Sequence, residues 1–140
     1  MTETTLAAIE KTVELDHGID RVWRAISDPA ELAQWFPNTS AEWELREQGE
    51  GRFTWTVDGK VFTTTVRIEK LDPPTHLAFT WGHESDDDPT TLVEWTLTAR
   101  DDGGTTMHVR ESGFRTEQHR AGNVEGWDSE TAELVAFLDG

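Results

Sequence analysis

The chain of 140 residues contains no cysteine, no tyrosine and only three lysines. Without cysteine, disulfide frameworks and thiolate metal sites are excluded. No apolar run approaches the roughly 20 residues that a membrane-spanning helix needs. The first residues, Met1–Lys11, include Glu3 and Glu10 and lack the basic-then-apolar pattern of a signal peptide. We therefore expect a cytoplasmic protein with no membrane partner.

Basic residues are also scarce: the chain has 12 lysines and arginines against 28 acidic residues, which gives a net charge of −16. Such a charge repels phosphate backbones, which argues against a nucleic-acid partner. A composition with few lysines and many Asp, Glu and Thr residues indicates a source organism that is adapted to salt or has a high-GC genome. Because added salt screens self-repulsion, we expect the folded state to gain stability as ionic strength rises.

The C-terminal stretch 122–138 has the clearest helical pattern in the sequence. Its apolar positions recur three, four and one residues apart, which indicates one apolar helical face. These positions are Val124, Trp127, Thr131, Leu134, Val135 and Leu138. The acidic residues between them are expected to face water: Glu125, Asp128, Glu130 and Glu133.

The N-terminal part predicts one strand followed by two short helices. Residues 7–15 alternate between apolar and polar side chains, as in a half-buried strand. Apolar residues at helical spacing over 19–26 predict the first helix. The second begins at Asp28-Pro29, with a capping side chain before a proline at the first helical position, and ends near Trp35-Phe36-Pro37.

Alternating strand patterns then follow in series up to residue 112. The first is expected over 43–46, where Trp43 and Leu45 alternate with charged residues, and Asp58-Gly59 is a strong hairpin turn. No repeat or low-complexity linker divides the chain, so a single domain over residues 1–140 is predicted. The expected order is one strand, two short helices, about six strands and one long helix. We predict an α+β fold, in which a curved antiparallel sheet grips the helix and a cavity lies between them.

Several short motifs resemble the START-like (SRPBCC) superfamily. They are Val22-Trp23-Arg24-Ala25-Ile26, Asp28-Pro29, Leu32 with Trp35-Phe36-Pro37, Pro73-Pro74, Phe79-Thr80-Trp81, Ser112-Gly113-Phe114 and Gly126-Trp127. The chain looks most similar to the branch named after the activator of the heat-shock protein 90 ATPase. This resemblance implies a helix-grip fold, with a seven-stranded antiparallel sheet around a long C-terminal helix, two short helices between the first two strands, and a hydrophobic pocket.

Glu111 departs from the pattern of that branch, whose members often carry histidine before Ser-Gly-Phe. Lys11 fits a position at which relatives often place a basic residue. The helix-grip order makes the first and last strands neighbours, so the two side chains are expected to lie near each other. Three interpretations are open: Lys11 and Glu111 form a structural pair, the two charges lie at a solvated mouth of the cavity, or Glu111 serves a ligand as a polar contact or general base.

Seven tryptophans and six phenylalanines supply large rings to the interior. The simplest role for such rings is in the core, and this is the expectation for Trp23. On a concave sheet, however, rings also leave gaps for a ligand. The residues predicted to bind ligand are Trp35, Phe36, Trp55, Trp81, Trp95, Glu111 and Trp127.

No cofactor or metal ion is expected. The five histidines show no i, i+4 zinc spacing, and the acidic loop 84–88 lacks the spaced acceptors of a calcium loop. Ser112 has no evident catalytic partners in sequence.

Three functions remain open from the sequence. We rank binding of a small hydrophobic molecule first. A co-chaperone-like or stress-related interaction with another protein, as the family name suggests, ranks second. An enzyme of the cyclase or hydratase type, with Glu111 as its base, ranks third. The sequence leaves the ligand and the oligomeric state undetermined.

Overall fold

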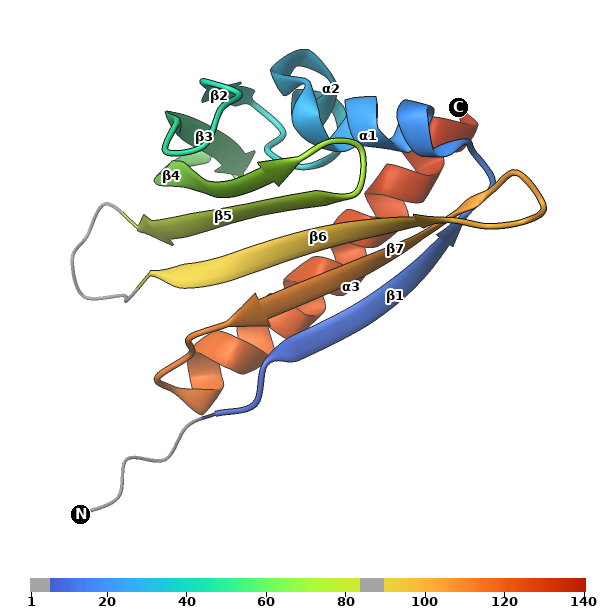
Figure 1. Cartoon of the computed structure of the whole chain (residues 1–140). Coiled ribbons are helices and arrows are strands. Elements are labelled where there is room, and N and C mark those ends of the chain that lie inside the picture. Colours follow the sequence, from blue (N-terminus) through green and yellow to red (C-terminus); the bar gives the residue numbers. More distant parts are fainter. Residues whose placement is uncertain (1–5, 84–89) are drawn as a thin grey trace.

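A computed structural model describes residues 6–83 and 90–140. It has the expected α+β architecture, with a long helix across one face of a curved sheet (Figure 1). The strands are β1 (Ile9–Leu15), β2 (Ser40–Trp43), β3 (Glu50–Val57), β4 (Lys60–Asp72), β5 (His76–His83), β6 (Thr91–Ala99) and β7 (Thr105–Ser112). The helices are α1 (Ile19–Ser27), α2 (Pro29–Trp35) and α3 (Glu117–Asp139).

The seven strands form one antiparallel sheet in the order β1-β7-β6-β5-β4-β3-β2. Helices α1 and α2 carry the chain from the β1 edge to the opposite edge at β2, and the meander then returns it to β7 beside β1 (Figure 1). Asp58 and Gly59 turn the β3–β4 hairpin with positive φ angles of 52° and 78°. The predicted hairpin and the predicted neighbourhood of first and last strands are confirmed.

Two tryptophan side chains tie the short helices to each other and to the sheet. The Asp28 side chain accepts a 3.0 Å hydrogen bond from Ala30 N and caps α2, whose first residue is Pro29 as predicted. Trp35 Nε1 donates to Ala25 O at 2.8 Å, and Trp43 Nε1 donates to Ser27 O at 2.9 Å. These bonds satisfy carbonyl groups at the C-terminal end of α1, which lack partners within the helix.

Strand β2 differs from the prediction, which placed it over 43–46. It ends at Trp43, and Leu45 is exposed. The chain turns immediately afterwards, with Arg46 N bonded to Glu44 O and Gly49 N bonded to Arg46 O. The alternation around Leu45 therefore belongs to a turn and not to a strand.

Helix α3 begins at Glu117, five residues before the predicted start, because residues 117–121 are helical but contribute no buried apolar side chain. Trp127, Thr131, Leu134 and Leu138 are buried against the sheet, while Val124 and Val135 are partly buried. No helix in the described parts of the chain is long and apolar enough to cross a membrane. Among residues 6–83 and 90–140, the apolar core lies between α3, α1, α2 and the concave face of the sheet.

Candidate functional site

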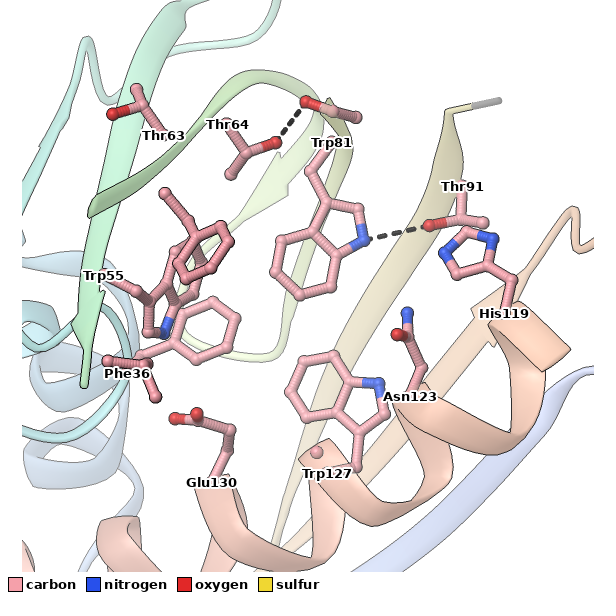
Figure 2. Close-up of a pocket in the computed structure, with 14 residues that line it drawn as sticks. Phe36, Trp55, Thr63, Thr64, Trp81, Thr91, His119, Asn123, Trp127 and Glu130 are labelled. Atoms are coloured by element: carbon pink, nitrogen blue, oxygen red, sulfur yellow. Dashed lines mark hydrogen bonds between the residues drawn. The ribbon is translucent and has the colours of Figure 1, made fainter. Parts of the chain in front are cut away.

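A pocket of about 270 Å³ lies between the sheet and α3 (Figure 2). The end of α2, strands β3 to β6 and α3 all contribute to its wall. The lining residues are Phe36, Trp55, Val57, Phe62, Thr63, Thr64, Trp81, Gly82, Thr91, His119, Asn123, Gly126, Trp127 and Glu130. Most of this surface is apolar, and five of the side chains are aromatic hydrocarbon or indole rings.

Phe36 sits among the rings of the pocket. Its ring stacks on Trp127, with centroids 5.5 Å apart and planes 18° apart, and lies 5.5 Å from the ring of Trp81. It also meets Trp55 edge-on at 5.4 Å. As the C-cap residue of α2, Phe36 leaves the helical path, and its N–H bonds to Leu32 O. The end of this short helix thus places an aromatic ring between the sheet and α3.

Behind this wall, Glu111 is completely buried and accepts hydrogen bonds from four side chains. Trp127 Nε1 donates to Oε1 at 2.8 Å, and Trp81 Nε1 donates to Oε2 at 2.9 Å. Asn123 Nδ2 lies 3.0 Å from both oxygens, and Thr91 Oγ1 donates to Oε2. All four partners line the pocket, whereas Glu111 does not. The buried carboxyl group therefore holds α3 to β5 and β6 by using the N–H and O–H groups of the pocket wall.

The predicted proximity of Lys11 and Glu111 does not produce a pair. Strand β1 does lie beside β7, but Lys11 is opposite Val109, while Glu111 is opposite Ile9. Lys11 Nζ bonds to Asp128 Oδ1 on α3 at 2.8 Å. The ion pair between Lys11 and Asp128 is accessible to solvent, so the lysine ammonium group stays hydrated. The buried carboxyl group of Glu111 accepts its hydrogen bonds from uncharged side chains and not from Lys11.

Glu130 is the acidic residue that the structure brings into the pocket wall, and the sequence had suggested that it faces water. It comes three residues after Trp127 and four before Leu134, so it borders the buried face of α3. Its Oε2 atom is buried and has no hydrogen-bond partner among the described residues. Burial, reinforced by the nearby charge of Glu133, raises the pKa of Glu130 to about 8, although a hydrogen bond from the Trp55 side chain opposes this.

The structure brings four of the predicted ligand-binding residues into the lining: Phe36, Trp55, Trp81 and Trp127. The other three predicted residues lie outside it. Trp35 and Trp95 belong to the core, and Glu111 supports the wall from behind. Trp95 is completely buried, and its Nε1 has no partner among the described residues. The prediction that rings at inward strand positions lie in the interior was therefore correct. Which of these rings border the cavity depends on where α2 and α3 cross the sheet.

The polar lining residues His119, Asn123 and Thr91 were not predicted from the sequence. For His119 and Asn123 a signal existed, because they precede Trp127 by eight and four residues on one side of α3. The rim also contains Val57 and Phe62, which are about half exposed on the β3–β4 hairpin. Nothing in the sequence distinguishes an apolar residue of a hairpin that borders a pocket from one that does not.

Within residues 6–83 and 90–140, no three metal-ligating side chains lie close enough together to hold a metal ion. The acidic loop 84–88, which was considered as a calcium loop, lies outside the described residues.

Comparison with solved structures returns proteins of the same fold. CalU16 from Micromonospora echinospora matches with a TM-score of 0.76 and 26% identity, over 94% of this chain and 75% of that one. DynU16, from the dynemicin biosynthetic locus, matches with a TM-score of 0.81 and 25% identity, over 94% of this chain and 47% of that one. Protein MLL2253 from Mesorhizobium loti matches with a TM-score of 0.81 and 24% identity, over 95% and 97%.

No curated protein matches the chain in sequence. A family model does match, and it covers residues 16–139, which include α1, α2, α3 and every strand except β1. The helix-grip arrangement described above agrees with this match and with the START-like resemblance of the motifs. This fold and these neighbours fit ligand binding in general. The chain belongs to the family described as activator of Hsp90 ATPase homolog 1-like protein.

Proposed function

We propose that the protein binds a small, predominantly apolar molecule in the pocket between the sheet and α3. The observation that carries this proposal is the pocket itself: about 270 Å³ of space bordered by Phe36, Trp55, Trp81 and Trp127. Concave sites with mainly apolar and aromatic walls and few polar groups are the usual form of small-molecule sites. Burying an apolar ligand there removes apolar surface of both ligand and rings from water.

The Glu111 network adds a second argument, because it determines what the wall offers a ligand. The N–H groups of Trp81 and Trp127 are both occupied by internal hydrogen bonds. Their rings are therefore held in place and present apolar faces to the pocket. A pre-formed wall lowers the entropy lost when a ligand binds.

The related structures agree with this proposal. DynU16 comes from a biosynthetic locus for dynemicin, so a relative of similar fold is linked to a small-molecule pathway. This chain spans about half the length of DynU16, and the comparison supports the class of function but not a particular ligand.

The two other functions considered from the sequence have less support. Catalysis with Glu111 as base requires a free oxygen facing a substrate, but both oxygens accept hydrogen bonds from the protein. A co-chaperone-like interaction is supported by the family name alone.

Filling the pocket tests the proposal directly. Gly126 lines the pocket on α3, and a Cβ atom there meets nothing within 4 Å. Gly126→Phe should place a ring in the pocket and abolish binding of naphthylmethanol, measured by isothermal titration calorimetry. Gly122→Phe is the matched control, since Gly122 is exposed on the same helix and also has open space around it. Equal binding by both variants and the parent, or no binding by the parent, contradicts the proposal.

A further inference from the structure

Glu130 gives the pocket a charge preference. In the described part of the chain it is the only acidic residue of the lining, and the lining contains no lysine or arginine. Figure 2 shows its carboxyl group projecting from α3 toward Phe36 and Trp55, away from the end of the pocket where His119 lies. The polar groups at the two ends of the pocket are therefore separated by rings.

The carboxyl group of Glu130 is incompletely satisfied by the protein. Oε2 is buried without a hydrogen-bond partner in the described residues, although the Trp55 side chain bonds to the group. A buried acceptor without a donor costs free energy, and a purely apolar ligand that displaced water would leave that cost in place. A ligand that donates a hydrogen bond to Oε2 removes this free-energy cost.

The surroundings of Glu130 favour a positively charged donor. Trp55 contacts its carboxyl group, and Trp127 lies one turn earlier on α3. The faces of indole rings attract cations, and a carboxylate beside them adds a charge-assisted hydrogen bond. The net charge of −16 raises the local concentration of cations further. An anionic ligand would find no lysine or arginine in the lining to pair with, and the Glu133 charge lies nearby.

We propose that the ligand is an apolar molecule carrying one protonated amine, which binds Glu130 between Trp55 and Trp127 while the apolar body packs on Phe36 and Trp81. This inference rests on the proposed binding function and specifies its ligand class. The aromatic rings supply most of the contact area, and Glu130 orients the molecule. A neutral alcohol of the same shape fills the pocket equally but forms the weaker, uncharged hydrogen bond.

Proton release follows from this arrangement. The pKa of about 8 means that Glu130 is mostly protonated at pH 7. When the protonated amine binds, the carboxyl O–H bond breaks, its proton passes to the buffer, and the carboxylate accepts a hydrogen bond from the ammonium group. Glu133 is the charged group that acts on Glu130, and His119 is the other titratable residue of the lining; the lining residues from β3 to β6 are apolar, threonine or glycine.

Three probes of equal shape test the charge preference: naphthylmethylamine, naphthylmethanol and naphthoic acid, substituted at the same ring position. In calorimetry at pH 7, the parent should bind the amine about tenfold more tightly than the alcohol, a difference that corresponds to one charge-assisted contact. The acid should bind most weakly. Titrations of the amine in buffers of different ionisation enthalpy should show release of close to one proton per ligand, and titrations of the alcohol none.

Glu130→Gln should abolish both the amine preference and the proton release, so that the amine and the alcohol bind the variant with affinities within about twofold of each other. Glu133→Gln is the matched control: it removes the same charge from an exposed position on α3 and should retain the preference. If the alcohol binds as tightly as the amine, or Glu130→Gln keeps the preference, the amine assignment is wrong and the pocket function stands. If no probe binds the parent, both proposals fail. Should Glu130→Gln not fold, proton release by the parent decides the assignment.

Discussion

Trp127 donates its indole N–H to Glu111 Oε1 at 2.8 Å, so a residue on α3 is tied to a completely buried carboxyl group on β7. The ring of the same tryptophan also stacks on the ring of Phe36. One side chain thus connects the last strand of the sheet, the long helix and the aromatic wall of the pocket.

Replacing Glu111 with glutamine should destabilise the fold by about 2 kcal/mol or more, because the new amide N–H₂ group faces donors instead of acceptors. Urea unfolding of the variant and the parent measures this loss. Glu42→Gln, at an exposed position on β2, serves as the control and should change stability by less than about 0.5 kcal/mol. Equal stability of Glu111→Gln and the parent would show that the network contributes little to the fold.

Stability should depend on pH through Glu130. Its pKa in the folded state is about 8, against an ordinary value of 4.5, so the folded protein holds a proton that the unfolded chain has released. The unfolding free energy therefore falls as pH rises from about 4.5 to about 8. After discounting for partial exposure, the effect is on the order of 2 kcal/mol.

The difference in unfolding free energy between Glu130→Gln and the parent isolates this effect, since other carboxyl groups titrate in both proteins. We expect the variant to gain on the parent as the pH of urea denaturation is raised from 5 to 8. Glu133→Gln should show a smaller gain, because it removes only the second cause of the raised pKa. A difference that is constant over this pH range contradicts the assignment.

The cap of α2 should contribute about 1 kcal/mol to stability. Asp28→Ala removes the acceptor of the Ala30 N–H, whereas Asp28→Asn keeps an oxygen in the same place. Thermal unfolding should therefore show a clear loss for alanine and little change for asparagine. Loss of stability in both variants would mean that the charge at the helix N-terminus, and not the hydrogen bond, is what matters.

Sodium chloride should stabilise the protein. Between about 0.05 M and 1 M salt the screening length shortens from over 10 Å to about 3 Å, which suppresses repulsion among the excess acidic residues. The ion pairs weakened by the same screening are mostly exposed, such as Lys11–Asp128, and each is worth little. We expect the melting temperature to rise on the order of 5 °C, and a flat or falling curve would contradict this.

The order of the elements could be predicted from the sequence, because the strands that face α3 alternate cleanly and the cap at Asp28 fixes where α2 begins. Strand β2 was misplaced, since Leu45 continues an alternation that the backbone does not follow. Periodicity indicates which residues lie on the apolar face of a strand or helix. It does not indicate which backbone hydrogen bonds end a strand.

The candidate site was predictable only in its aromatic part. Glu130 was missed because an acidic residue on a helix is expected to face water, and only the tertiary position of β3 against α3 removes it from solvent. For Lys11 the neighbouring strand was predicted correctly, but the partner was left open, because the sequence does not show how α3 is rotated toward β1. Such contacts depend on the angle at which a helix crosses the sheet, and this angle cannot be derived from the pattern of residues along the chain.

Gly126 leaves a bare segment of backbone on the side of α3 that borders the pocket. Under the proposed binding function, substitutions at Gly126 should set the size of the molecule that the pocket admits, while the sheet and the Glu111 network stay as they are. Alanine there should trim the available room by one methyl group and favour the helix, whereas larger residues should select for shorter molecules.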